Sequence, residues 1–189
     1  MTGIQSISTA CSCNPLCIER AKNTDTICSK CYATTYLKMR KNLKLALERN
    51  SELLSNAVIP TDELPIINAS IFRFEAFGDL INDTHLVNFI NIAKANPNTT
   101  FALWTKNAHI LKSVFSNTDK PNNLNIILSS PFINKVATVP TELSNIIDKV
   151  FTVYDKAQNV DINCGSKDCL GCRLCYSKNN TTLISERLK

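Results

Sequence analysis

Eight of the nine cysteines lie in two groups near opposite ends of this 189-residue chain. The first group is Cys13-x3-Cys17-x10-Cys28-x2-Cys31, and the second is Cys164-x4-Cys169-x2-Cys172-x2-Cys175. Cys-x2-Cys spacing lets two thiolates on one turn of backbone bind the same metal centre. The two groups therefore predict metal-binding loops at both termini, and these loops restrict how the intervening chain can fold.

The start of the chain and its cysteine count indicate a reducing compartment. The segment MTGIQSISTACS has no Lys or Arg and no apolar run of signal-peptide length, and no later segment is long enough to span a membrane. We therefore expect a cytoplasmic protein that makes no membrane contact. Cytoplasmic thiols stay reduced, and an odd number of cysteines also argues against a closed disulfide framework.

The C-terminal group has the more specific spacing. Cys169, Cys172 and Cys175 follow one another at x2 spacing, which resembles the run that wraps a [4Fe-4S] cluster, with Cys164 as the fourth ligand. Zinc is the alternative, but zinc ribbons use two separated Cys-x2-Cys pairs, and a third cysteine at x2 would crowd a single ion. The spacing therefore favours an iron-sulfur cluster over zinc.

The N-terminal group fits either metal. Cys13 and Cys17 followed by Cys28 and Cys31 can bind zinc as two pairs, or a cluster through three or four ligands. Cys11 is a spare thiol that could replace one of them, although an unligated side chain is its simplest interpretation. The spacing alone leaves zinc and iron-sulfur open at this end.

The formal charge of +5 suggests an anionic partner such as nucleic acid. This value counts every thiol as neutral. Two sites of four thiolates would each carry roughly −2 with their metal, leaving the protein near +1. The total charge is therefore weak evidence for nucleic-acid binding.

Apolar periodicity predicts an α/β fold in one domain. Residues 33–57 have the pattern of an amphipathic helix. Strands are predicted at 66–77, 101–105, 124–128 and 150–154, alternating with helices at 82–95, 107–115 and 142–147. We expect about four strands in a small parallel sheet or partial (β/α) barrel, with a small doubly wound sheet as the alternative. The domain comprises an N-terminal Cys loop (1–32), an α/β core (33–160), a C-terminal Cys loop (161–178) and a tail (179–189).

Polar residues at the predicted strand ends are the candidates for binding a small ligand. Gly78 and Asp79 follow the first predicted strand, in a chain with only four glycines, and Thr105 and Lys106 end the next strand. Ligands of parallel sheets bind at the carboxyl ends of the strands. Since a plain turn would also explain Gly78 and Asp79, both interpretations stay open, and no acid-base pair that would identify a catalytic residue is evident.

Four short motifs together resemble the gene-product-88-like family of bacteriophage proteins. They are Cys28-x2-Cys31-Tyr32-Ala33, the strand Phe72-Arg73-Phe74 leading into Gly78-Asp79, the strand end Trp104-Thr105-Lys106, and Cys172-x2-Cys175-Tyr176. That family in turn looks like a reduced relative of radical S-adenosylmethionine enzymes.

The resemblance implies a phage protein of the host cytoplasm with a [4Fe-4S] cluster on three N-terminal cysteines. The open iron of that cluster would bind S-adenosylmethionine, with Gly78 and Asp79 contacting the amino group of the cofactor. The C-terminal cysteines would hold an auxiliary cluster. The competing hypothesis is a non-enzymatic module, stapled by iron-sulfur clusters or zinc, that binds a host protein or nucleic acid through the face from Lys38 to Arg49.

Overall fold

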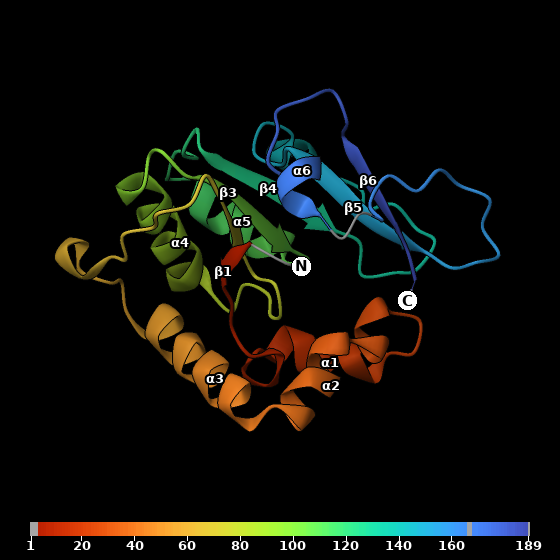
Figure 1. The fold of residues 1–189 in the computed structure, drawn as a ribbon, viewed down its shortest axis with the longest axis horizontal. Helices are drawn as coiled ribbons and strands as arrows, with labels where there is room; N and C mark the ends of the chain where they lie inside the picture. The colour runs from red at the N-terminus through yellow and green to blue at the C-terminus, as the bar shows by residue number, and fades with distance from the viewer. Residues whose placement is uncertain (1–3, 166–167, 189) are drawn as a thin grey trace.

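A computed structural model describes residues 4–165 and 168–188, which form a six-stranded parallel sheet (Figure 1). The strands are β1 (Gln5–Ile7), β2 (Ile71–Phe74), β3 (Thr100–Thr105), β4 (Leu124–Ser129), β5 (Lys149–Tyr154) and β6 (Leu183–Arg187). Each strand pairs with the next one along the chain, in the order β1-β2-β3-β4-β5-β6. All five pairings are parallel.

This consecutive order distinguishes between the partial barrel and the doubly wound sheet, the two architectures that the sequence left open. Doubly wound sheets reverse their strand order at a switch point, whereas (β/α) barrels keep it consecutive around the sheet. The structure has the consecutive order, and β1 and β6 each pair with one neighbour only. The sheet is therefore open and wound in one direction, as in a partial barrel.

Six α-helices and four short 3₁₀ helices connect the strands. The α-helices are α1 (Pro15–Lys22), α2 (Tyr32–Met39), α3 (Lys41–Asn56), α4 (Asp83–Ala95), α5 (Ala108–Phe115) and α6 (Cys169–Cys172). The 3₁₀ helices are η1 (Cys11–Cys13), η2 (Ile27–Lys30), η3 (Thr61–Glu63) and η4 (Thr141–Leu143). Within the described residues, none of the helices combines the length and apolarity needed to cross a bilayer.

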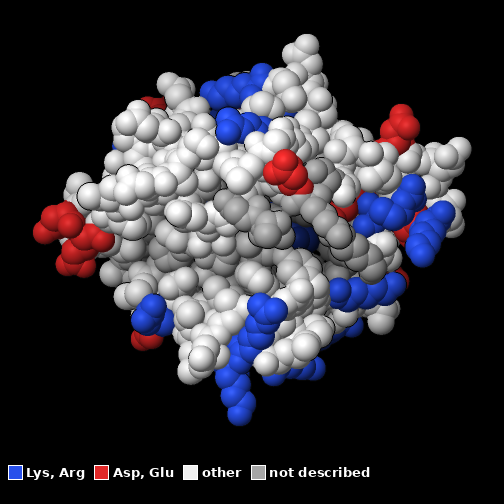
Figure 2. Space-filling model, viewed as in Figure 1, with Lys and Arg blue, Asp and Glu red and all other residues white. Residues whose placement is uncertain are grey.

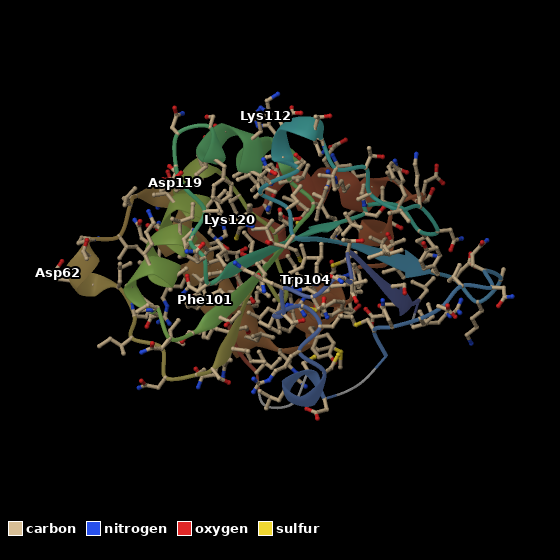
Figure 3. All side chains as sticks on the ribbon, turned by 90° about the horizontal axis from the view of Figure 1, so that it is seen from above. Asp62, Phe101, Trp104, Lys112, Asp119 and Lys120 are labelled. Atoms are coloured by element: carbon tan, nitrogen blue, oxygen red, sulfur yellow. The ribbon has the colours of Figure 1, made fainter. Side chains whose placement is uncertain are left out.

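Side chains alternate between two buried layers on either face of the sheet. In β3, Phe101 and Leu103 pack beneath α4 and α5, while Ala102 and Trp104 face the second layer together with Tyr176 and Ile184. Strands buried on both faces are apolar throughout, which explains why the sequence shows apolar runs here. Figure 3 shows Phe101 and Trp104 within the sheet and Asp62 far out at the periphery.

The predicted central elements are confirmed with small changes. Four strands lie between residues 71 and 154, and α4 begins at the predicted cap, where Asn82 accepts a hydrogen bond from the amide of His85 at 3.0 Å. The helix predicted at 33–57 is two helices, because the backbone leaves the helical conformation at Arg40. The helix predicted at 142–147 is only the 3₁₀ turn η4.

The sequence did not reveal the two edge strands. Residues 1–32 were expected to be a loop and 179–189 a tail, yet they contain β1 and β6. Both strands are short and carry polar side chains, as in Gln5-Ser6-Ile7, so neither shows an apolar run. Pairing with β2 and β5 makes them strands, and pairing between distant segments is not visible in local periodicity.

Candidate metal and cofactor site

A cavity of about 400 Å³ lies where the N-terminal segment meets the carboxyl ends of β1, β2 and β3. Cys11 follows β1, Gly78 and Asp79 follow β2, and Lys106 follows β3. The side chains around the cavity include four cysteines: Cys11, Cys17, Cys28 and Cys31. Leu16, Ile18, Leu37 and Phe77 add apolar walls. The cavity therefore combines soft thiol ligands with polar groups at a sheet edge that commonly binds ligands.

Cys11 is held in place by the long helix α3. The amide of Ala10 donates to Ser51 Oγ at 2.9 Å, and Asn50 Nδ2 donates to the carbonyl oxygen of Ser8 at 3.1 Å. Asn50 lies at the gap in the apolar pattern of residues 33–57, and these contacts explain the polar residue there. They hold the turn after β1 against α3, so that Cys11 is buried at the cavity wall.

Cys17 is positioned through the start of α1. Asn14 caps this helix by accepting from the amide of Leu16 at 3.0 Å, and Pro15 occupies the first helical position. The Asn14 amide group also donates to the carbonyl oxygens of Asp79 at 2.8 Å and Leu80 at 3.0 Å. One buried side chain therefore joins the helix that carries Cys17 to the loop after β2.

Cys28 and Cys31 are anchored to the far side of the sheet edge. The amide of Ile27 donates to the carbonyl oxygen of Pro131 at 2.8 Å, and Thr26 forms a β-bridge with Phe132 after β4. Cys31 is the N-cap residue of α2. The N-terminal segment thus reaches from β1 to the end of β4.

The four thiols of the cavity influence one another. Burial raises the pKa of both Cys17 and Cys28. The nearby positive charge of Lys106 lowers the pKa of Cys28 and so offsets part of this rise. A hydrogen bond with Cys11 lowers the pKa of Cys31 to about 5, and the same bond raises the pKa of Cys11. Burial makes thiolates costly to form in this cavity, and a bound metal ion would offset that cost.

The structure places Cys11 in this cavity where the spacing predicted Cys13. Both residues belong to η1, whose three residues per turn direct side chains two positions apart to different sides. Cys13 is exposed and borders a separate groove with Glu48, Arg49 and Glu52. From spacing alone, Cys11 is interpreted as a spare thiol. Its position directly after β1 is what places it in the cavity, whereas Cys13 lies outside.

Asp79, Thr105 and Lys106, all predicted from strand ends, form one hydrogen-bonded group. Asp79 Oδ1 accepts from the Thr105 hydroxyl at 2.5 Å, and Oδ2 accepts from the amide of Lys106 at 2.9 Å. The amide of Leu80 also donates to Oδ1 at 2.8 Å. The carboxylate is buried and joins the end of β2 to that of β3 beside the cavity.

A second buried acidic residue, Glu75, lies beside Gly78, and it belongs to none of the motifs in the sequence. Glu75 Oε1 accepts from the Thr9 hydroxyl at 2.9 Å and lies 3.3 Å from His85 Nε2. Burial raises the pKa of Glu75 to about 8 and lowers that of His85 to about 3, so this pair is uncharged near pH 6. The sequence does contain one indication of this residue, because Glu75 is an acidic residue directly after the apolar strand β2.

The C-terminal cysteines lie in the crossover between β5 and β6. Cys164 bridges to Glu186 of β6, Cys169 and Cys172 begin and end α6, and Cys175 packs against the sheet. Burial and the other three thiols of the group together raise the pKa of Cys175 to about 12, with burial the larger cause. The four predicted residues are thus near enough to interact electrostatically. Figure 1 shows α6 and this crossover beside β4 and β5.

In neither cysteine group do the described side chains point at one common metal position. Across residues 4–165 and 168–188, no three His, Cys, Asp or Glu side chains are arranged to hold a single metal ion. The N-terminal thiols instead surround a cavity, and the C-terminal thiols are distributed along one crossover.

A comparison with known protein families finds the same family that the four short sequence motifs suggest. The sequence model of the family described as gene product 88 matches residues 5–186, from β1 to β6. The chain belongs to the gene product 88 family. The match includes both cysteine groups and all of the sheet except Arg187, so the sheet and cavity lie within the part shared with this family. No curated protein and no solved structure matches the chain significantly.

Proposed function

We propose that this gene product 88 protein is a phage-encoded iron-sulfur protein of radical S-adenosylmethionine type. Its N-terminal cysteines would hold a [4Fe-4S] cluster beside a site for S-adenosylmethionine. The observation that carries the proposal is that four thiols, from η1, α1, η2 and the N-cap of α2, line one cavity together with Gly78 and Asp79.

The chemistry of the donor set supports a cluster over a single ion. In a [4Fe-4S] cluster each thiolate binds a different iron, so the ligands surround the cluster. Four ligands of zinc must instead meet at one ion. Thiols placed around a cavity of about 400 Å³ suit the first arrangement better. This volume is within the range of ligand pockets, roughly 300–1,000 Å³.

The remaining cavity residues would suit a partly apolar cofactor that carries both an amino and a carboxylate group, because the acidic Asp79 lies among four basic residues, Arg20, Lys38, Lys44 and Lys106. A reduced cluster, when bound, supplies the electron that cleaves S-adenosylmethionine. Asp79 offers a buried carboxylate beside the cavity, fixed by Thr105 and the Lys106 amide, that would face the amino group of the cofactor. Gly78 lets this loop pack closely against Thr9, and Leu16 and Phe77 exclude water. The substrate class does not follow from these residues.

A second candidate function is suggested by the C-terminal group. Cys175 and Tyr176 pack in the second buried layer against Ile127 and Phe151, and Asn125 Nδ2 donates to the carbonyl oxygen of Cys175 at 3.3 Å. A cluster or zinc ion there would staple the β5–β6 crossover to the sheet. If the metal at both cysteine groups only stabilises the fold, the protein is a binding module and not an enzyme.

Anaerobic purification followed by iron, sulfide and zinc analysis tests the proposal. We expect brown protein containing iron and sulfide in equal amounts, and an electron paramagnetic resonance signal of the reduced cluster that changes when S-adenosylmethionine is added. Colourless protein with stoichiometric zinc would overturn the iron-sulfur assignment. Iron with an unchanged signal would favour the stapled module.

A further inference from the structure

The positive charge of this protein is concentrated in one segment. Residues 20–49 contain eight of the 21 Lys and Arg residues but only two of the 16 Asp and Glu residues. The formal charge of this segment is +6, so the rest of the chain is nearly neutral at −1. The total charge is weak evidence for any partner. The distribution of charge is more informative, because it places the excess positive charge in one region, residues 20–49.

The basic residues of this region lie on the outer surface of helices α2 and α3. Lys38, Arg40, Lys41 and Lys44 are all exposed. Figure 2 shows Lys and Arg side chains along the lower edge of the molecule, where Figure 1 places α1, α2 and α3. Lys44 is 3.6 Å from Glu48, the one acidic residue between positions 26 and 49. Little negative charge therefore offsets the basic surface.

Exposed aromatic rings adjoin the basic residues. Tyr32 and Tyr36 of α2 are 52% and 41% exposed, and their ring centroids lie 5.8 and 6.0 Å from that of Phe77. The guanidinium group of Arg40 lies over the Tyr36 ring, 5.1 Å from its centroid. The Tyr32 hydroxyl donates to the carbonyl oxygen of Ala76, which fixes its ring beside that of Tyr36 while about half of each side chain stays accessible to solvent. We call Tyr32, Tyr36, Lys38, Arg40, Lys41 and Lys44 the basic-aromatic surface.

We propose that the basic-aromatic surface binds single-stranded nucleic acid. Lysines spaced along a surface attract successive phosphates, and exposed aromatic rings stack on unpaired bases. An anionic membrane or an acidic protein would use the lysines but would not need exposed rings for base stacking. In a duplex the bases are stacked on one another, so the rings could not reach their faces.

The basic-aromatic surface borders the metal and cofactor cavity, because Lys38 and Lys44 also line its mouth. A bound strand would therefore run past the opening of the cavity. Binding at this surface requires no reaction in the cavity, so it can be tested apart from the proposed function. Strand binding without iron would refute only the cluster proposal, and iron without strand binding would refute only this inference.

Fluorescence anisotropy with the purified full chain tests the inference. The probes are a labelled 20-nucleotide single strand as DNA and as RNA, the duplex of the same sequence, and vesicles of phosphatidylglycerol and phosphatidylcholine. We expect at least one single strand to bind about tenfold or more tightly than the duplex, and the vesicles not to compete. Replacing Lys38, Lys41 and Lys44 together by alanine should reduce the slope of log K against log salt by about 2.

Two further sets of variants separate charge from stacking. Tyr36→Ala should weaken strand binding about 5- to 100-fold, and Tyr36→Phe should retain it. The matched control replaces Lys94, Lys135 and Lys156, three exposed lysines outside the segment, by alanine and should leave binding unchanged. Circular dichroism should show that every variant is folded. The inference is wrong if no strand binds, if the duplex or vesicles bind as tightly as the single strands, or if the control variant loses as much affinity.

Discussion

The Glu75 carboxylate accepts hydrogen bonds from both the hydroxyl and the amide of Thr9, at 2.9 and 3.3 Å, across 66 positions of sequence. Glu75 adopts a left-handed backbone with φ of 59°, which is rare for a residue other than glycine. Thr9 is two residues before Cys11, and Glu75 is three residues before Gly78. This pair therefore fixes the ends of β1 and β2 against each other, close in sequence to Cys11 and Gly78, which line the cavity.

Replacing Glu75 by alanine should destabilise the protein by about 2–4 kcal/mol. The change removes the acceptor of the buried Thr9 amide and leaves the Thr9 hydroxyl only its long contact of 3.5 Å to the carbonyl oxygen of Asp79, and an unsatisfied buried group costs more than the lost bond. Urea unfolding followed by circular dichroism measures the effect. Glu142→Ala is the control, because Glu142 lies at the surface in an ion pair with Lys112 and its loss should change the midpoint little. Equal effects of the two changes would contradict the positioning role of Glu75.

Glu75 should also make stability depend on pH. Burial raises its pKa to about 8 from an ordinary value of 4.5, so the folded protein holds more protons than the unfolded chain between these values. The free energy of unfolding contributed by this group is therefore highest below pH 4.5 and decreases as the pH rises through 8. The contribution lost is on the order of 5 kcal/mol.

The variant Glu75→Gln isolates this contribution, since glutamine keeps the shape but does not titrate. The difference in free energy of unfolding between wild type and variant should fall between pH 6.5 and 9. His85, with its pKa lowered by burial to about 3, acts in the opposite direction below pH 6.5 and is present in both proteins. A difference independent of pH would show that Glu75 is ionised in the folded protein throughout this range.

Gly78→Ala should prevent correct assembly of the cavity. A Cβ atom at this position would lie 2.7 Å from the carbonyl oxygen of Thr9 and 2.5 Å from Glu75 Oε2, and it would also contact the Thr9 hydroxyl. Since a backbone carbonyl cannot move aside cheaply, we expect a loss of about 1–3 kcal/mol and reduced iron content. Gly165→Ala is the matched control, because nothing lies within 4 Å of its added Cβ atom. Normal stability and iron in Gly78→Ala would contradict the packing described.

Serine replacements distinguish the two assignments of the N-terminal ligands. Cys17→Ser, Cys28→Ser and Cys31→Ser should each lose the iron of the N-terminal cluster, which is about half of the total where the C-terminal group also holds a [4Fe-4S] cluster, because their thiols line the cavity. Cys13→Ser should keep its iron, since Cys13 is exposed outside the cavity. Iron and sulfide analysis of each anaerobically purified variant gives the answer. Loss of iron in Cys13→Ser, with retention in one of the other three, would restore the ligand set expected from spacing.

Local patterns in the sequence identified most of the core but neither edge of the sheet. The apolar runs of β2, β3, β4 and β5 reflect burial on both faces, which is a property of each strand separately. The three-residue strand β1 has no such pattern, because its side chains are mostly exposed and its conformation depends on pairing with β2. Short edge strands of this kind become recognisable only once their neighbour is in place.

The sequence by itself determined the residue types and the local elements: two groups of cysteines, the central α/β alternation, and Gly78 and Asp79 at a strand end. Only the tertiary structure decided which residues meet. It brings Asp79 to Thr105, and it places Cys11 in the cavity while Cys13 faces away. Periodicity records which face of an element is buried, whereas the meeting of distant segments depends on strand order and on buried polar contacts such as those of Glu75 and Asn14.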